Sequence, residues 1–210
     1  LHSPYTLSLH DALPILQEGR KQARECPDLL VSLESDDPAA RRWAARDLVN
    51  FQDVAASLVN RLKREGDLSV REVILTTLTR FGDSTAVAGL VDCLRSEEAA
   101  LRNEAIEAMK QLPDEVAPII HGLLADSDPD VRIFAVNILE SLRHPDVESW
   151  LIEVIETELN VNVCGTALDL LSEVGTDAAL EPLARFKARF SDEPYIQFAA
   201  DLALSRIHED

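Results

Sequence analysis

The sequence is poor in the residues on which most β folds depend. Glycine occurs seven times in 210 residues and aromatic side chains make up 5% of the chain, whereas hydrophobic residues make up 46%. Turn-rich β folds need more glycine than this, and the abundant Ala and Leu are good helix formers. The composition therefore predicts an all-α protein of ordinary globular hydrophobicity.

Cysteine and long apolar runs are also scarce. The three cysteines, Cys26, Cys93 and Cys164, lie far apart in the sequence. Such a small, odd set does not form a disulfide framework and is typical of a reducing compartment. No run approaches the roughly 18 apolar residues of a membrane-spanning helix. We therefore expect a cytoplasmic protein that does not associate with membranes.

Basic residues are the third shortage. The chain has 20 Lys and Arg against 38 Asp and Glu, which gives a formal net charge of −18. Residues 1–105 hold 13 basic and 17 acidic residues, whereas residues 106–210 hold 7 and 21. A chain this acidic repels phosphate backbones and anionic lipid, so we expect no nucleic-acid partner. The acidic excess either serves solubility alone or favours a protein partner with a basic surface.

The first residues do not share the pattern of the rest. No Lys or Arg precedes Arg20, and the apolar residues of 1–15 are interrupted by polar ones, so this stretch does not resemble a signal peptide. The segment Tyr5–Ile15, YTLSLHDALPI, instead resembles the translation of a short-read sequencing adapter. We therefore expect residues 1–15 to be non-native or disordered, and residues 16–210 to form a single domain.

A motif with a period of 30 to 33 residues recurs six times. Each copy has acidic or polar turn residues, then an aliphatic–Arg pair, then an apolar helix, as in DSDPDVRIFAVNILESL at 126–142. The arginine position holds Arg41, Arg71, Arg102, Arg132, Cys164 and Gln197. Because another apolar helix precedes each turn, the repeat contains two helices, and about six such repeats predict an α-solenoid.

Two further positions of the repeat indicate how its helices pack. Three residues after the arginine position come Ala44, Ile74, Ala105, Ala135, Ala167 and Ala200. Seven residues after it come Leu48, Leu78, Met109, Leu139, Leu171 and Leu204. Both positions share one helical face, so the small residue permits close approach and the larger one fills the core. We place Pro118 and Pro182 in the first turns of their helices, where a missing N–H costs nothing.

The aliphatic–Arg pair after an Asp-rich turn resembles HEAT repeats, specifically the short bacterial type also found in phycobilisome lyases. The resemblance covers about Cys26 to Ile207, and the last two copies depart from it because Cys164 and Gln197 replace arginine. It implies a right-handed α-solenoid of about six two-helix HEAT-like repeats. It also implies that each repeated arginine pairs with turn acids of a neighbouring repeat. The acids available are Asp36, Asp67, Glu98 and Asp128.

The chain carries no recognisable catalytic or metal-binding motif. Outside residues 1–15, the histidines His121, His144 and His208 are far apart and lack a ligand partner at i+4. There is no Gly-rich phosphate loop, G-x-S-x-G elbow or paired CxxC. We expect His144 in a loop and Cys164 as a buried hydrophobe rather than a reactive thiol. We therefore expect no enzyme activity, cofactor or metal.

The remaining candidates lie opposite the core on the second helix of each repeat. In solenoids these helices usually line the concave side, which binds partners. The predicted partner-binding residues are Arg42, Trp43, Arg46, Glu104, Glu107, Phe134, Asn137, Asp169 and Glu173. Trp and Arg are frequent interface anchors, but packing on an adjacent repeat explains Trp43 and Phe134 equally well. Trp150 lies in a first helix, and we expect it in the core.

Three functions compete at this point. The first is a non-enzymatic protein–protein interaction scaffold or adaptor of the bacterial cytoplasm, which acts as a monomer through its concave face. The second, implied by the resemblance, is a phycobilin-lyase-like enzyme or lyase subunit, which requires tetrapyrrole binding and hence a shift in bilin absorbance. The third, a HEAT-like DNA glycosylase, needs a basic groove, and the acidic C-terminal half opposes it.

We expect deletion of residues 1–15 to leave the thermal midpoint of unfolding unchanged, because this segment lacks the repeat pattern and contributes no repeat core position. The measurement is thermal unfolding of the full and shortened chains under identical conditions. A loss of several degrees would show that the segment packs on the solenoid.

Overall fold

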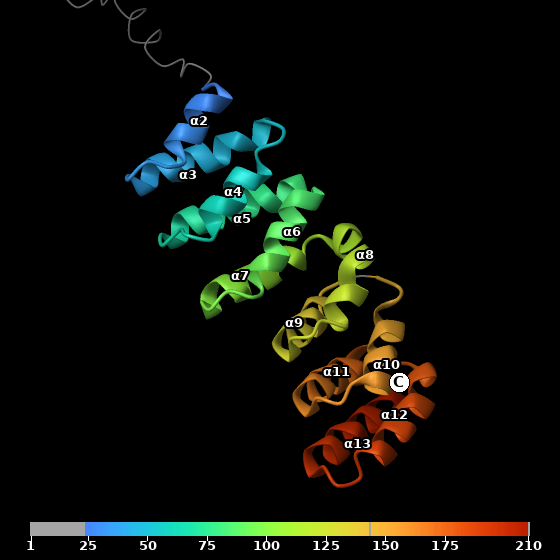
Figure 1. The fold of residues 1–210 in the computed structure, drawn as a ribbon. Helices are drawn as coiled ribbons and strands as arrows, with labels where there is room; N and C mark the ends of the chain where they lie inside the picture. Colours follow the sequence, from blue (N-terminus) through green and yellow to red (C-terminus); the bar gives the residue numbers. More distant parts are fainter. Residues whose placement is uncertain (1–23, 143, 210) are drawn as a thin grey trace, which may run out of the picture.

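The computed structural model describes residues 24–142 and 144–209. Over these ranges the chain forms twelve α-helices and one 3-10 helix, with no strand. The helices stack in sequence order into an elongated two-layered array (Figure 1). The predicted all-α solenoid is therefore confirmed, whereas the prediction for residues 1–15 lies outside the described residues.

Each repeat contributes one helix to each layer. The first helices are α2 (Cys26–Ser32), α4 (Ala55–Leu62), α6 (Ser84–Cys93), α8 (Pro113–Leu124), α10 (Val147–Thr157) and α12 (Asp177–Arg189). The second helices are α3 (Pro38–Asp47), α5 (Leu68–Phe81), α7 (Ala99–Met109), α9 (Pro129–Leu139), α11 (Val161–Val174) and α13 (Pro194–Glu209). The 3-10 helix η1 (Leu48–Asn50) continues α3. Consecutive second helices pack on one another from α3 to α13, and these contacts form a continuous ridge along the array (Figure 1).

The repeated small and large residues lie where the sequence places them. The side chains three residues after the arginine position are all fully buried: Ala44, Ile74, Ala105, Ala135, Ala167 and Ala200. The larger residues are buried as well, apart from Leu204 in the last described helix, which is half-buried. Trp150 is 7% exposed, which confirms its place in the core. The repeat register read from the sequence is therefore correct.

Polar side chains cap most of the second helices. Asp67 Oδ1 accepts hydrogen bonds from the Ser69 and Val70 amides at 2.9 and 3.2 Å, at the start of α5. The side chains of Asp128 and Asn160 cap α9 and α11 in the same way. These oxygens satisfy backbone N–H groups that a helix leaves unpaired at its first turn. The short polar turns thereby fix where each second helix begins.

The expected positions of two prolines are wrong. Pro118 and Pro182 lie beyond the first turns of their helices, because α8 begins at Pro113 and α12 at Asp177. Pro113 supplies the favourable N-terminal proline of α8 itself. The side chain of Thr176 accepts from the Ala178 amide, so α12 begins at Asp177, five residues before Pro182. Local capping, rather than the internal proline, therefore sets these two helix boundaries.

The repeated arginine first secures the turn of its own repeat. At five of the six copies, the side chain at this position donates to the backbone carbonyl six residues earlier. The donors are Arg41, Arg71, Arg102, Arg132 and Cys164, and the acceptors are the carbonyls of Ser35, Glu65, Ser96, Asp126 and Glu158. This constant spacing explains why the aliphatic–Arg pair follows each turn at a fixed distance.

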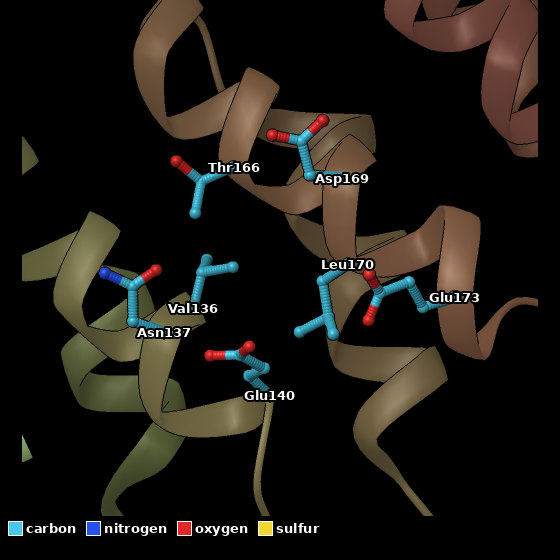
Figure 2. A pocket seen from close by; sticks show the side chains of 7 residues that line it. All are labelled: Val136, Asn137, Glu140, Thr166, Asp169, Leu170 and Glu173. Atoms are coloured by element: carbon cyan, nitrogen blue, oxygen red, sulfur yellow. The ribbon is translucent and has the colours of Figure 1, made fainter. Parts of the chain in front are cut away.

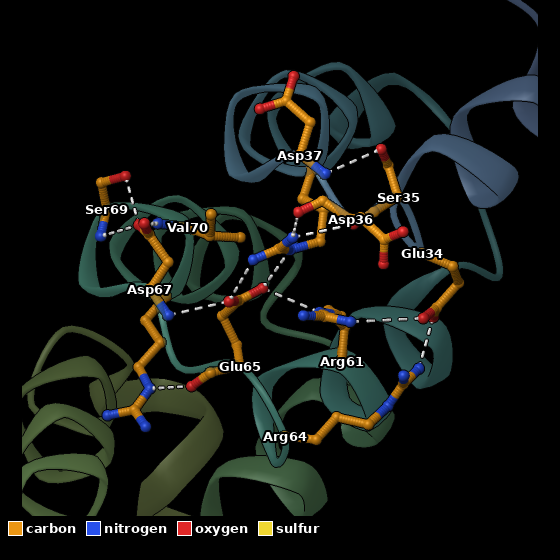
Figure 3. A network of polar contacts seen from close by, with 12 residues as sticks. Glu34, Ser35, Asp36, Asp37, Arg61, Arg64, Glu65, Asp67, Ser69 and Val70 are labelled. Atoms are coloured by element: carbon orange, nitrogen blue, oxygen red, sulfur yellow. Dashed lines mark hydrogen bonds and ion pairs between the residues drawn. The ribbon is translucent and has the colours of Figure 1, made fainter.

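Three of these arginines also bind a carboxylate in the turn of the next repeat. Arg41 donates to both oxygens of Glu65 at 2.8 Å, and Arg71 and Arg132 bind Glu98 and Glu158 in the same two-pronged manner. Figure 3 shows Glu65 at the centre of the first such network. The implied pairing between repeats is therefore confirmed for three of the four repeated arginines, and we call these three pairs the arginine ladder.

The prediction of which acidic residues pair with the repeated arginines is wrong for three of the four candidates. Of the four candidates only Glu98 pairs with a repeated arginine. Asp67 and Asp128 are occupied as helix caps, and Asp36 contributes its carbonyl oxygen rather than its carboxylate. Glu65 and Glu158 each lie two residues before the residue that caps the next helix, Asp67 or Asn160. At this position of the turn the side chain faces the preceding repeat. The capping requirement, which acts within a repeat, excludes the capping acids from the ladder.

Other contacts are found at two steps where the described residues lack a ladder pair. At the fifth repeat, Arg189 from the end of α12 donates to the carbonyls of Ile155, Glu156 and Glu158, and so holds the turn that precedes Cys164. At the third repeat, the guanidinium of Arg102 lies 5.7 Å from the centre of the Phe134 ring. The turn at Cys164, where arginine is replaced, and the step at Arg102, where arginine is kept, are thus both supported by contacts outside the ladder.

We expect Ala135→Leu to lower the free energy of unfolding by roughly 1–3 kcal/mol, because overpacking a fully buried position forces side chains off their preferred rotamers. The measurement is urea denaturation, with Ala100→Leu on the exposed face of α7 as the matched control. Equal denaturation midpoints for the wild type and Ala135→Leu would contradict the packing described.

We expect Glu65→Gln to cost about 3 kcal/mol at neutral pH, because it leaves the buried guanidinium of Arg41 without its carboxylate. Burial alone would raise the pKa of Glu65, but hydrogen bonds from Arg41, Arg61 and the Asp67 amide lower it from 4.5 to about 2. A lowered pKa in the folded state contributes stability above pH 4.5 and loses it as the pH falls toward 2.

The difference in stability between the wild type and Glu65→Gln should therefore shrink over this pH range. Urea denaturation between pH 7 and 3 measures it, and the exposed Glu97→Gln serves as the control. A difference that stays constant with pH would contradict the assignment.

Candidate protein-binding surface

The exposed sides of α3, α5, α7, α9, α11 and α13 form one continuous surface, which we call the second-helix surface. Its N-terminal end carries Arg42, Trp43 and Arg46 on α3, all three of them exposed. The guanidinium of Arg46 lies 3.9 Å from the centre of the Trp43 ring, and 36% of Trp43 remains accessible. This end of the surface is therefore aromatic and basic.

A groove of about 610 Å³ lies between α5 and α7 on this surface. Leu75 and Ala108 are buried in its floor, and the predicted residues Glu104 and Glu107 lie on its α7 side together with Asn103. Glu107 forms an ion pair with Lys110 at 3.0 Å, whereas one oxygen of Glu104 is buried without a hydrogen bond. Burial raises the pKa of Glu104, and the nearby charge of Arg71 opposes this effect.

A second, smaller groove of about 190 Å³ lies between α9 and α11. Figure 2 shows Asn137 of α9 and Glu140, the residue that follows α9, facing Asp169 and Glu173 of α11 across a floor that includes Leu170. Three of the predicted partner-binding residues thus converge at one place although they come from two repeats. The structure brings together side chains that are more than 30 positions apart in the sequence.

Phe134 lies between the two grooves. It is half-buried, packs against the hydrophobic core and lies beneath the guanidinium of Arg102. Its ring therefore contacts the α7 side chain of the adjacent repeat and is only partly exposed on the second-helix surface. Two interpretations of Phe134 were open from the sequence, an interface anchor and packing on the adjacent repeat. Its contacts with the core and with Arg102 favour packing.

Several residues of this surface escaped the sequence analysis. Glu72 and Thr76 line the α5–α7 groove, and Glu140 lines the α9–α11 groove. On α13, Phe198 and Leu202 are 69% and 39% exposed, so the C-terminal end of the surface is apolar. These two residues occupy the repeat positions of Arg42 and Arg46, a signal obscured by the loss of the motif arginine at Gln197.

The reactive side chains elsewhere are engaged in packing. Burial raises the pKa of the Cys93 and Cys164 thiols to about 11, and Cys164 is buried as predicted. His144 lies in the turn before α10 and stacks on Trp150 with ring centres 4.8 Å apart. Within residues 24–142 and 144–209, no group of three or more His, Cys, Asp or Glu side chains is arranged to hold a metal ion.

Comparison with protein families agrees with this geometry. The family model of HEAT repeats matches residues 54–120 and 116–205. The chain belongs to the HEAT-repeat family. The two matched regions overlap and together cover most of the array, from α4 to α13. No curated protein matches the chain.

Three solved structures are similar to this chain at low sequence identity. An engineered protein is 20% identical, with 89% of this chain and 97% of that chain covered and a TM-score of 0.41. The complex of CpcE and CpcF of phycocyanin lyase from Nostoc sp. PCC7120 is 17% identical, with 99% of each chain covered and a TM-score of 0.38. A designed armadillo repeat protein is 16% identical, covers 87% of this chain and 100% of that chain, and has a TM-score of 0.38.

In the part of the chain that the structure describes, every helix is too short or too polar to cross a membrane.

Proposed function

We propose that this protein is a non-enzymatic scaffold or adaptor that binds another protein on its second-helix surface. The observation that carries the proposal is the charge of the two grooves. Six of the 17 residues that line them are carboxylates, Glu72, Glu104, Glu107, Glu140, Asp169 and Glu173, and none is basic. A cleft lined by one sign of charge attracts the opposite sign and raises the rate of encounter. The partner we propose therefore presents a basic surface.

The two ends of the surface give the interaction a direction. Arg42 and Arg46 make the N-terminal end basic, whereas Phe198 and Leu202 make the C-terminal end apolar. A partner whose acidic, basic and apolar groups follow in the matching order binds in one orientation only, because the reverse orientation places like charges opposite each other. Directional binding is what an adaptor that positions its partner requires.

The remaining features of the proposal follow from the sequence and the thiols. We propose a monomer of the bacterial cytoplasm, where Cys26, Cys93 and Cys164 remain reduced; all three are free in the structure. The scaffold role is supported by the HEAT repeats and by the two acidic grooves on one continuous face. That this face is the concave one is part of the proposal.

We expect Asp169→Lys combined with Glu173→Lys to slow association with the partner by about tenfold at low salt, because exposed interface charges act mainly on the on-rate. The effect should shrink as salt is added, since mobile ions screen such charges. The measurement is the association rate of the partner, identified by cross-linking to the wild-type chain, at two salt concentrations.

The matched control reverses two exposed carboxylates of the opposite layer, Glu153 on α10 and Glu181 on α12. These changes alter the net charge equally but lie away from the second-helix surface. If the Glu153 and Glu181 changes slow association while those at Asp169 and Glu173 do not, the partner binds the first-helix layer and the proposal fails.

A further inference from the structure

The α5–α7 groove differs from a general acidic surface in having an apolar floor. Leu75 and Ala108 are 8% and 4% exposed and form its base, while Leu68 at its rim is 66% exposed. The hydroxyls of Thr76 and Thr79 lie along the α5 side, where each donates back to a carbonyl of its own helix. An occupant of this groove therefore meets apolar carbon at the base and oxygen acceptors at the edges.

Glu104 carries a carboxylate oxygen that lacks a hydrogen bond among the described residues. Its Oε2 atom is buried and forms no hydrogen bond, although 29% of the side chain is exposed. The nearest cation is Arg71, whose Nη1 lies 3.8 Å away, beyond hydrogen-bond distance. Arg71 is already committed to the carboxylate of Glu98 and the carbonyl of Glu65. A buried carboxylate oxygen without a hydrogen bond is costly, and a cation bound at the exposed part of the Glu104 side chain would stabilise its charged form.

The other carboxylates of the groove do not supply the missing hydrogen bond. Among the described residues, Glu72 takes part in no ion pair, and Glu107 is paired with Lys110. Burial raises the pKa of Glu104, so the free protein holds this carboxylate at a cost that a bound cation relieves. The groove thus combines apolar carbon, a net negative charge and a partly exposed carboxylate whose one ion pair, with Arg71, is long at 3.8 Å.

We propose that the α5–α7 groove binds a lysine or arginine side chain of the protein partner. The methylene stem lies on Leu68, Leu75 and Ala108, and the charged head donates to Glu104 with Glu72 beside it. Long cationic side chains have this division, since they bury an apolar stem while the head stays with polar groups. This inference rests on the proposed scaffold function and deepens it, because it assigns one residue of the partner to one groove.

A role of Glu104 in stability alone predicts a different outcome from a role in binding. The folded state raises its pKa and so disfavours its charged form. At neutral pH, Glu104→Gln is therefore expected to leave the thermal midpoint of the free protein equal or higher, while it weakens binding of a cation. Function gained at a cost in stability is common at binding sites. A structural carboxylate would instead lose stability when neutralised.

The test uses the full chain, labelled with ¹⁵N, and short peptide probes followed by NMR titration. The first probe is acetyl-Gly-Ser-Arg-Ser-Gly-amide, and two further probes carry citrulline or norleucine in place of arginine. We expect the arginine probe to shift amide signals of α5 and α7 and to bind about fivefold more tightly than either substitute, as loss of a charged hydrogen bond implies. Spermidine, a free cation with a similar stem, is titrated separately.

Glu104→Gln should weaken the arginine probe about fivefold, whereas Glu181→Gln, the matched neutralisation on α12, should not. The inference fails if the norleucine probe binds as well as the arginine probe, if Glu104→Gln has no effect on binding, or if it lowers the thermal midpoint together with binding. It fails equally if spermidine occupies the groove and the arginine probe does not, since the natural occupant is then a small polycation.

This experiment separates the inference from the proposed function. If partner association depends on Asp169 and Glu173 but the arginine probe does not bind the α5–α7 groove, the scaffold function stands and the assignment of the groove to a cationic side chain is wrong. If the arginine probe binds at Glu104 while partner association is unaffected by charge reversal on α11 and by Glu104→Gln, the scaffold function is wrong as assigned.

Discussion

A buried guanidinium requires the protein to supply both a counter-charge and acceptors for its N–H groups, and the arginine ladder meets this requirement with two turns at once. Arg41 shows the arrangement: it donates to carbonyls of its own turn and to both oxygens of Glu65 in the next. Each such residue thereby fixes the distance and orientation between consecutive repeats. The second-helix surface, which is assembled from one helix per repeat, inherits its geometry from these contacts.

At two steps of the array a ladder pair is missing among the described residues, and the residues exposed on the second-helix surface differ on either side of the first of them. Among the described residues, Arg102 pairs with no carboxylate of the next turn, and its guanidinium lies instead over the ring of Phe134 on α9. At Cys164 the turn is held from the other side by Arg189. The two acidic grooves lie on either side of the first of these steps. Variation in the ladder pairing thus accompanies distinct subsites along a regular array.

Charge has two separate roles in this molecule. In the turns, acidic side chains pair with arginines or cap helices, and both kinds of contact contribute to stability. Glu65, for example, pairs with Arg41, and Asp67 caps α5. On the second-helix surface, Glu72, Asp169 and Glu173 have no cation of the grooves to pair with. The 38 acidic residues therefore include a structural set that arginines and helix ends engage locally, and a surface set that contributes to the net charge of −18 and is available to a partner.

The sequence by itself determined the helical class, the repeat register and the buried face, because these depend on periodicity within one helix and on turn chemistry within a few residues. Ala135, Leu139 and Trp150 were placed in the core on that basis, and the structure agrees. Tertiary structure alone decided which turn acid pairs with each arginine, and that Asn137 and Asp169 face each other across one groove. It also left one oxygen of Glu104 without a donor. Those outcomes depend on how one repeat is rotated against the next, a quantity set by the packing of two helix layers and by no local pattern.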